Sequence, residues 1–465
     1  MNSGNFSYLS MASLSPYRSG LQEITAQDYG HALLSSMGVG EPLLAALPAD
    51  NRSASALWAD SGAMALTGLP DGAPLHSPAP LAACAQGAWL ALSTLCPEHF
   101  ASDFAAYRLL GERAALFGYK RQGDRSPGGS CRLLSCADAI LAINLARDDD
   151  FELLPAWLQT DVHDWEGLAA ELPDYPAALL LERARLLGLA VAVSSAPACD
   201  GPGHSADPAS WFRQTPYGAR RRPTSADEQP LVVDLSSLWA GPLCGQLLAQ
   251  SGARVIKVEG LTRADGARTG SPAFFDLMNS GKECVALDLT SEKGQRQLYR
   301  LLELADIVIE STRPRALEQM QINAEPMLAQ RPGKVWLSIT GYGRCAPNRD
   351  WIAYGDDAGV AAGLSQLMEQ VYGQPLICGD AIADPLTGLH SAVLARHAWH
   401  QGGGVLLDVA LRDVVNFGAG FSADPRLCQP DLKSYPVSPP VARRAPLRAG
   451  ELGRDTQAVC REFGL

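Results

Sequence analysis

Residues 231–259 read LVVDLSSLWAGPLCGQLLAQSGARVIKVE and carry the clearest secondary-structure pattern in the sequence. Residues 231–234 form a short run of β-favouring residues, and residues 255–258 form a second one. Between them, a Gly-Pro turn is followed by leucines at helical spacing, and Gly252 ends this predicted helix. The segment therefore predicts a β-α-β unit.

Two further strand-helix units follow along the chain. Their predicted elements are a strand at 284–290, a helix at 295–304, a strand at 306–310, a helix at 316–329 and a strand at 335–340. Strands that alternate with helices in this way are typical of a parallel sheet with crossover helices. We therefore expect an α/β fold for the second half of the chain.

The first half of the chain has a different pattern. Residues 81–95 and 177–189 are rich in Ala and Leu and predict helices. Residues 131–134 and 140–145 are apolar runs on either side of a polar turn, and they predict a β-hairpin. Residues 195–230 are dense in Pro, Gly, Ser and Arg without either apolar period, which is typical of a linker.

Length and composition exclude several classes of protein. The chain has 465 residues, of which 47% are hydrophobic and 19% charged, as expected for a globular protein of several domains. The net charge of −12 disfavours a nucleic-acid or anionic-membrane partner. Eleven cysteines without a C-x-x-C pair predict reduced thiols and no metal site. Because no apolar run reaches about eighteen residues, we expect a soluble, cytoplasmic protein without a membrane partner.

Motifs in one fixed order between residues 231 and 413 carry a family resemblance. They are VVDLSSLWAGP, LLAQSGARVIKVE, FFDLMNSGKECVALDLTSEKG, ADIVIESTRPRALEQM, SITGYGRCAP, ADPLTGLHSAVLA and GGGVLLDVALRD. Together they resemble family III CoA-transferases, which include formyl-CoA and carnitine-type CoA-transferases and share their fold with the α-methylacyl-CoA racemases. The resemblance implies a Rossmann-like CoA-binding domain with a parallel sheet, accompanied by a smaller α+β domain.

The remaining segments resemble other parts of this family in a rearranged, fused order. SPGGSCRLL and the strand ILAINLA look like the glycine loop and small domain that normally follow the last motif, and residues 446–465 resemble the family's closing segment. We expect five parts: a flexible N-terminus at 1–24, a degenerate transferase-like half with the small domain at 25–194, a linker at 195–230, a Rossmann-like CoA-binding catalytic half at 231–413 and a C-terminal wrap-around segment at 414–465.

In the family an aspartate is the nucleophile, and the residue that matches it is Asp384. A carboxylate that attacks a thioester forms a mixed anhydride, which then accepts CoA thiolate and later yields to the incoming acid. The alternative is that Asp384, which directly precedes a proline, caps a helix. Asp380, four residues earlier, is a competing carboxylate.

A faint internal repeat places Ala83 where the second half has Asp384. Residues 60–68 and 80–91 parallel residues 357–363 and 381–392, with Gly87 opposite Gly388. The resemblance and the repeat together imply one catalytic carboxylate per chain.

The resemblance also implies which residues meet CoA. Leu238, Trp239 and Ala240 are expected at the pantetheine and acyl end. The residues expected near the nucleotide and its phosphates are Leu287, Ser311, Thr312, Arg313 or Arg315, and Arg263 or Arg268. Gly128 and Gly129 resemble a flexible loop that covers the reacting aspartate, although a plain Gly-Gly turn is the alternative. Trp351 and Tyr354 fall where the family has an active-site aromatic residue or a histidine.

The leading hypothesis is a CoA-transferase that binds CoA as a substrate, with no permanent cofactor, and takes an acyl-CoA and a small carboxylic acid. Both a homodimer and a monomer in which the fused halves mimic a dimer are compatible with the sequence. A racemase of the same fold would need a histidine base, for which His390 is the candidate. A non-catalytic CoA-binding paralogue is a further alternative, as is a nicotinamide enzyme using Glu259, which lacks the expected glycine fingerprint.

Overall fold

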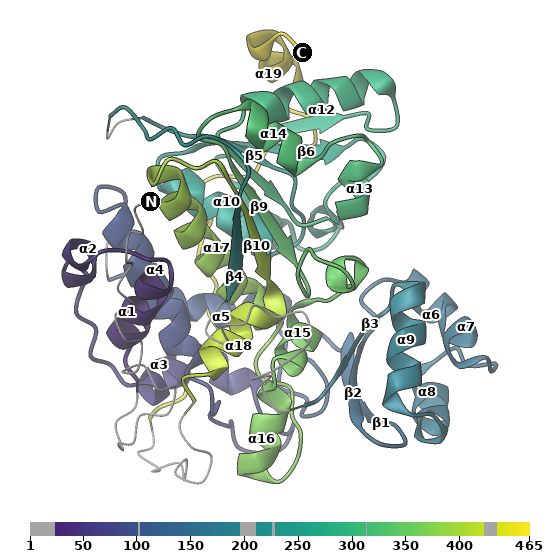
Figure 1. The fold of residues 1–465 in the computed structure, drawn as a ribbon. Helices are drawn as coiled ribbons and strands as arrows, with labels where there is room; N and C mark the ends of the chain where they lie inside the picture. The colour runs from purple at the N-terminus through teal and green to yellow at the C-terminus, as the bar shows by residue number, and fades with distance from the viewer. Residues whose placement is uncertain (1–23, 101–102, 196–210, 226–227, 313, 423–434) are drawn as a thin grey trace, which may run out of the picture.

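A seven-stranded sheet lies at the centre of the protein (Figure 1). The computed structural model describes residues 24–100, 103–195, 211–225, 228–312, 314–422 and 435–465. The strands, in spatial order, are β4 (Phe212–Pro216), β10 (Val405–Ala410), β9 (Val335–Thr340), β8 (Ile307–Glu310), β5 (Leu231–Asp234), β6 (Arg254–Gly260) and β7 (Glu283–Leu287). All neighbouring pairs are parallel except β4 and β10, so the predicted α/β fold is confirmed.

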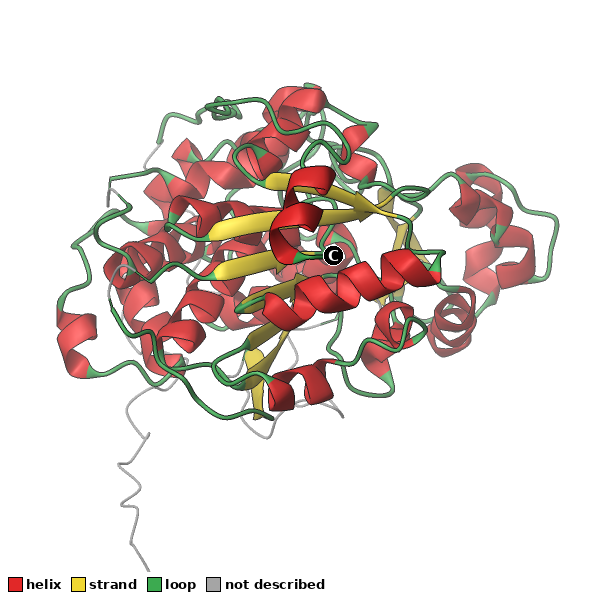
Figure 2. Cartoon of the chain, turned by 90° about the horizontal axis from the view of Figure 1, so that it is seen from above, coloured by secondary structure: helices red, strands yellow, loops and turns green. Residues whose placement is uncertain are grey.

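Helices cover both faces of this sheet, as Figure 2 shows from above. The crossover helices are α10 (Ala240–Gln250), α11 (Pro272–Asn279), α12 (Glu292–Leu304), α13 (Pro314–Glu318), α14 (Ala324–Gln330) and α17 (Ala383–His400). Successive strand residues point to opposite faces. Val232 therefore packs in one core with α10 and α17, whereas Val233 packs in a second core with α12 and α14. The result is a three-layer sandwich.

Two predictions for this half are wrong in detail. The helix predicted at 316–329 is two helices, because α13 ends at Glu318 and Gln321 then adopts a left-handed conformation with φ 59° before α14 begins. Part of the predicted linker, Phe212–Pro216, is the edge strand β4. Its side chains are half-buried or exposed, so no apolar alternation marks the strand in the sequence.

Five helices precede the small domain, and two of them pack directly against α17 of the sheet domain. The five helices are α1 (Ala26–Ser36), α2 (Glu41–Ala45), α3 (Ala54–Asp60), α4 (Leu81–Leu95) and α5 (Leu109–Phe117). Every residue of α4 is buried, because α1 packs on one side of it and α17 on another. Residues of α1, α4, α10 and α17 belong to one hydrophobic core. This core therefore crosses the boundary between the two predicted halves.

The small domain projects from this body (Figure 1). It consists of β1 (Cys131–Ser135), β2 (Ile140–Asn144), β3 (Ala190–Val193), α6 (Asp149–Glu152), α7 (Leu154–Leu158), α8 (Trp165–Glu171) and α9 (Ala177–Leu187). The predicted hairpin is confirmed as β1 and β2, and β3 extends it to a three-stranded antiparallel sheet. The four helices pack on one face of this sheet around a core of their own.

The last segments connect the two regions. Helices α15 (Gly355–Ala361) and α16 (Leu364–Tyr372) precede α17, and α18 (Leu411–Ala419) follows β10. Residues 435–449 then run along the first half, where Arg443 pairs with the buried Glu112. The chain ends in α19 (Thr456–Phe463), whose start is fixed to β7 because the Asp455 carboxylate accepts a hydrogen bond from the Cys284 N–H at 2.8 Å. None of the helices among the described residues has the length and apolar composition needed to cross a membrane.

Candidate active site

The candidate site lies at the carboxyl ends of β5 and β8. The chain leaves β5 toward β6 and β7 on one side, and it returns to β8 on the other side. In open α/β sheets, ligands bind in the crevice at such a switch point. The loops that follow the two strands meet here, since the Ser237 N–H donates to Ser311 Oγ at 3.2 Å.

The loop from β5 to α10 holds an exposed apolar side chain in a strained conformation. Leu238 has φ 71°, in the left-handed region that bulky residues avoid, and its side chain is 44% exposed. Its N–H donates to Asp265 Oδ1 at 3.0 Å. Trp239 and Ala240 follow directly and are buried. Strain of this kind persists only where surrounding contacts impose it, and it is found preferentially at functional sites.

Two buried lysines on the sheet side of the loop hold it in this conformation. Lys257 Nζ donates to the Ser236 carbonyl at 2.9 Å and pairs with Asp265 at 2.9 Å. Lys282 Nζ pairs with Asp234 at 2.8 Å and donates to the Pro242 carbonyl at the start of α10. Both lysine side chains are fully buried. The ion pairs therefore tie the loop and the first turn of α10 to the sheet.

Asp384 lies in the first turn of α17, facing the start of α10. Its carboxylate accepts hydrogen bonds from the backbone N–H groups of Ala240 and Gly355. Burial is the main cause that raises the pKa of Asp384 to about 6, while the Arg113 guanidinium and the two N–H groups act in the opposite direction. The residue as a whole is only half-buried. Asp384 is thus an anion at neutral pH that a ligand can reach.

Two further carboxylates and one arginine surround Asp384. Arg113, from α5 of the first half, donates to both oxygens of Asp380 at 2.6 and 2.9 Å. Asp356 accepts from the Ala381 N–H at 2.7 Å, and its burial next to Asp380 raises its pKa. Sequence reasoning missed Arg113 and Asp356. A lone arginine in an ordinary amphipathic segment, 267 positions before its partner, carries no signal in a single sequence.

An aromatic wall runs from the β5–α10 loop to the Gly-Gly turn. Trp239 packs edge-on against Phe274 at 5.4 Å between ring centroids, Phe274 contacts Phe117, and Phe117 stacks on Tyr119. A Cβ atom at Gly128 would lie 3.3 Å from the Tyr119 ring. The neighbouring Gly129 has φ 83° and open space around its Cα. The predicted loop residues therefore lie one aromatic ring away from Arg113, whose guanidinium is 5.8 Å from the Tyr119 centroid.

The residues predicted near the nucleotide lie in different environments. Leu287 is buried in the core at the end of β7, so a ligand would meet its backbone and not its side chain. Thr312 carries a buried hydroxyl without a hydrogen-bond partner among the described residues. Arg263 is exposed and forms no ion pair with any residue that the structure describes, but it lies within electrostatic range of Tyr354. Arg313 lies outside the described residues.

Other residues singled out from the sequence are paired with a neighbouring side chain, covered by one, or exposed. Both oxygens of Glu259 accept from Arg268, at distances of 2.6 to 3.1 Å, which leaves Glu259 unsuited to a ribose and Arg268 unsuited to a phosphate. Arg315 is exposed at the start of α13. Trp351 is covered by the Arg185 guanidinium, which lies 3.5 Å from the ring centroid.

His390 is buried on α17, and both of its ring nitrogens are engaged. Nδ1 lies 2.7 Å from the Leu386 carbonyl, which can only accept, so Nδ1 carries the proton. Nε2 therefore accepts from the Tyr29 hydroxyl at 2.7 Å. Burial lowers the pKa of His390 to about 4. An imidazole held in this way cannot serve as the base of a racemase.

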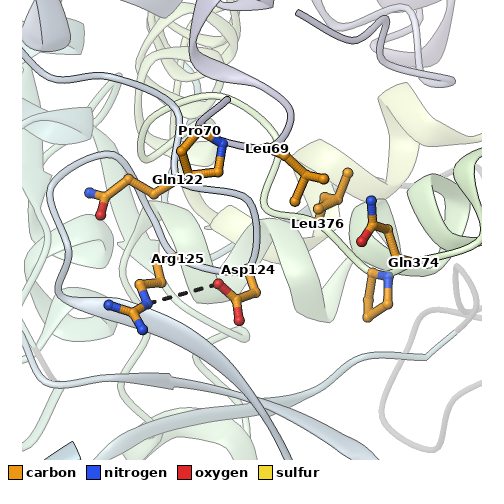
Figure 3. Close-up of a pocket in the computed structure, with 8 residues that line it drawn as sticks. Leu69, Pro70, Gln122, Asp124, Arg125, Gln374 and Leu376 are labelled. Carbon is orange, nitrogen blue, oxygen red and sulfur yellow. Dashed lines mark ion pairs between the residues drawn. The ribbon is translucent and has the colours of Figure 1, made fainter. Parts of the chain in front are cut away.

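A cavity of about 340 Å³ opens between the two halves (Figure 3). Its lining comes from residues 69–70, 122, 124–125 and 374–376. The Arg125 and Asp124 side chains face each other at its rim, 3.9 Å apart. None of the described residues that are predicted to bind CoA lines this cavity, so it is distinct from the crevice at β5 and β8. No cluster of possible metal ligands occurs in the described part of the chain.

The second half of the chain is similar to known proteins. Residues 228–422 match the model of CoA-transferase family III, which confirms the resemblance seen in the sequence. The chain is 33% identical over 200 residues to a succinate–glutarate CoA-transferase of Agrobacterium fabrum, covering 39% of this chain and 50% of that protein. It is 31% identical over 217 residues to a formyl-CoA:oxalate CoA-transferase of Afipia carboxidovorans, covering 44% and 51%.

Solved structures match over the same extent. A CaiB/BaiF family protein from Brucella suis is 30% identical with a TM-score of 0.37, covering 41% of this chain and 55% of that chain. The chain spans about half the length of the curated relatives it matches.

Proposed function

We propose that this protein is an acyl-CoA:carboxylate CoA-transferase with Asp384 as its nucleophile. The observation that carries the proposal is the environment of Asp384: a half-buried carboxylate at the switch-point crevice, held by the N–H groups of Ala240 and Gly355. The family match of residues 228–422 supports the reaction class. Relatives named for transfer between succinate and glutarate, or formyl-CoA and oxalate, suggest short carboxylic acids as first substrates to test.

The reaction would proceed in balanced acyl-transfer steps. A carboxylate oxygen of Asp384 attacks the thioester carbonyl, the C–S bond breaks, and the acyl group and Asp384 form a mixed anhydride while CoA thiolate leaves. The thiolate then attacks the Asp384 carbonyl, which releases the donor acid and leaves CoA on Asp384 as a thioester. The acceptor carboxylate attacks that thioester, the C–S bond breaks, and CoA thiolate leaves as a second anhydride forms between the acceptor acid and Asp384. Finally, the thiolate takes the acceptor acyl group and frees Asp384.

The residues around Asp384 suit these steps. The two N–H groups orient its carboxylate and can stabilise charge that develops beside it. Leu238 and the aromatic wall of Trp239 and Phe274 offer an apolar surface to the pantetheine and acyl group. Gly128 and Gly129 are proposed to close over the anhydride and exclude water. Arg263 is proposed to meet the CoA phosphates, since it is exposed and forms no ion pair with a carboxylate among the described residues.

The first half is proposed to be a degenerate copy of the second. A Cβ at Gly87 of α4 would lie 2.5 Å from the Ala26 carbonyl at the start of α1. A Cβ at Gly388 of α17 would lie 2.8 Å from the Ala240 carbonyl at the start of α10. The two helix pairs thus share one close contact at matching positions, and Ala83 occupies the place of Asp384. One reactive carboxylate per chain is the consequence.

Transfer of CoA between acids tests the proposal. The protein is incubated with succinyl-CoA and each of a panel of free acids, and new CoA esters are separated by chromatography. We expect exchange with at least one acid in the wild type and none in Asp384→Asn, an isosteric variant without a nucleophilic oxygen anion. Incorporation of deuterium from the solvent at the α-carbon of a branched acyl-CoA would instead indicate a racemase. CoA binding without either reaction would indicate a non-catalytic paralogue.

Oligomeric state and location remain separate predictions. Light scattering on the purified chain distinguishes the monomer, in which α1 and α4 fill the place of a second copy, from the homodimer. Cell fractionation tests the predicted cytoplasmic location.

A further inference from the structure

We propose that Arg113 is a positioning residue for the transfer reaction, supplied to the reactive centre of the second half by helix α5 of the first half. This inference rests on the proposed function. Arg113 forms a two-pronged ion pair with Asp380, and Asp380 begins the turn that leads into α17 and Asp384.

The geometry of the pair is suited to fixing a side chain. Both N–H···O contacts are short, at 2.6 and 2.9 Å, and the Asp380 side chain is fully buried. The guanidinium also lies 5.5 Å from the Trp239 ring centroid and 5.8 Å from that of Tyr119. A planar guanidinium can satisfy a bidentate carboxylate and contact aromatic faces at once, which lysine cannot do.

The turn that Arg113 holds is itself strained. Gly379 has φ 70° and Ala381 has φ 43°, which alanine rarely adopts. The Ala381 N–H is fixed by Asp356, and the Gly379 N–H donates to Thr67 Oγ1 at 2.9 Å. Thr67 also belongs to the first half. Two residues of the first half, Thr67 and Arg113, therefore hold the turn that aims Asp384 at the start of α10.

Arg113 also acts on Asp384 through its positive charge, in addition to holding the turn. The ionisable groups that face its guanidinium are Asp380 in the turn, Asp356 on α15, Asp384 on α17 and Tyr119 after α5. Of these, three are carboxylates, and Arg113 is the cation that acts on Asp384. Without it, repulsion among the carboxylates would favour protonation of Asp384 and remove the nucleophile. The first half would thus remain necessary for the chemistry although it carries Ala83 in place of an aspartate.

Substitution of Arg113 tests this inference in the full-length protein. We expect Arg113→Gln to lower kcat for CoA exchange by about 100-fold, the order found when one preorganised electrostatic partner is removed. We also expect the acidic limb of the kcat profile to move to higher pH, because Asp384 loses its cation. Arg113→Lys keeps the charge without the bidentate contact, so it should retain the wild-type limb at a reduced kcat.

Two controls separate positioning from folding. Arg108→Gln breaks an exposed ion pair with Asp60 beside the same helix and should change neither kcat nor the pH limb. The double variant Arg113→Gln with Asp380→Asn removes one cation and one anion, so it avoids an unpaired buried charge. It should fold, bring the acidic limb back toward wild type and keep a low kcat, because the turn has lost its anchor.

The outcomes are distinguishable from failure of the proposed function. If wild type shows no exchange, or if Asp384→Asn retains it, the proposed function fails. If wild type exchanges CoA and folded Arg113→Gln keeps both kcat and its acidic limb, the inference about Arg113 alone is overturned. Should Arg113→Gln not fold, full kcat in Arg113→Lys and in the double variant would overturn it equally.

Discussion

The contact between α17 and α10 is the feature on which the position of Asp384 depends, and Gly388→Ala perturbs it with one methyl group. An added Cβ would lie 2.8 Å from the Ala240 carbonyl and 2.9 Å from Leu243 Cδ2, whereas ordinary contact begins at 3.4 Å. The helices must therefore separate by about half an ångström. Overpacking of this kind costs about 1–3 kcal/mol of stability.

The same separation moves the Ala240 N–H away from the Asp384 carboxylate. Because a displacement of about 1 Å can cost about 100-fold in rate, we expect kcat in Gly388→Ala to fall by about tenfold. The free energy of unfolding is measured in urea, and kcat is measured for CoA exchange under conditions where the variant is fully folded.

Gly87→Ala is the matched control. Its added Cβ would lie 2.5 Å from the Ala26 carbonyl, so we expect a loss of stability at least as large as in Gly388→Ala. None of its contacts is with Asp384 or its hydrogen-bond donors, and kcat per folded molecule should stay unchanged. Equal kcat values in the two variants, whether both were normal or both were reduced, would show that the α17–α10 contact does not set the position of Asp384.

Four further predictions address the remaining parts of the site. Leu238→Ala should raise KM for acyl-CoA by about fivefold with little change in kcat, since its exposed side chain is expected to be covered by substrate; an unchanged KM would exclude this contact. Lys282→Met leaves Asp234 as an unpaired buried charge and should lower the free energy of unfolding in urea by about 3–5 kcal/mol. Activity should fall as the pH drops through about 6, where Asp384 becomes protonated, and a flat profile between pH 5 and pH 8 would contradict this. Burial holds the pKa of His390 at about 4 in the folded protein, below its value in the unfolded chain. As the pH falls, the unfolded chain therefore binds a proton at His390 before the folded protein does. The stability contributed by His390 is full at neutral pH and is lost as the pH falls toward 4. Replacing His390 by Gln should remove that part of the pH dependence, seen in urea titrations, without abolishing CoA exchange.

The sheet could be predicted because its signal is local. Buried parallel strands such as Val335–Thr340 are mostly apolar runs, and crossover helices such as α10 show leucines at helical spacing. This apolar signal is missing at β4, because it is an edge strand whose side chains are half-buried or exposed. The prediction also failed between α13 and α14, where a single left-handed residue, Gln321, ends a helix that the apolar pattern would continue.

The candidate site could be predicted only where a motif carried it. Asp384 and the β5–α10 loop were found through the family motifs, and the structure brings them together through the Ala240 N–H. Arg113 could not be found, because its pairing with Asp380 depends on the packing of the two halves. Leu287 stays a prediction: its side chain packs in the core at the end of β7, so its backbone is the part that a nucleotide could meet.

Chemical trapping on Asp384 is the sharpest test of its proposed role as nucleophile. The wild-type protein is mixed with an accepted acyl-CoA and then with hydroxylamine, which converts an acylated or thioesterified carboxylate into a hydroxamate, and the digested protein is mapped by mass spectrometry. We expect a hydroxamate on Asp384 that depends on acyl-CoA and is absent from Asp384→Asn. A protein that exchanges CoA at its normal rate while Asp384 stays unmodified, or that carries the hydroxamate on Asp356 or Asp380, would contradict the assignment.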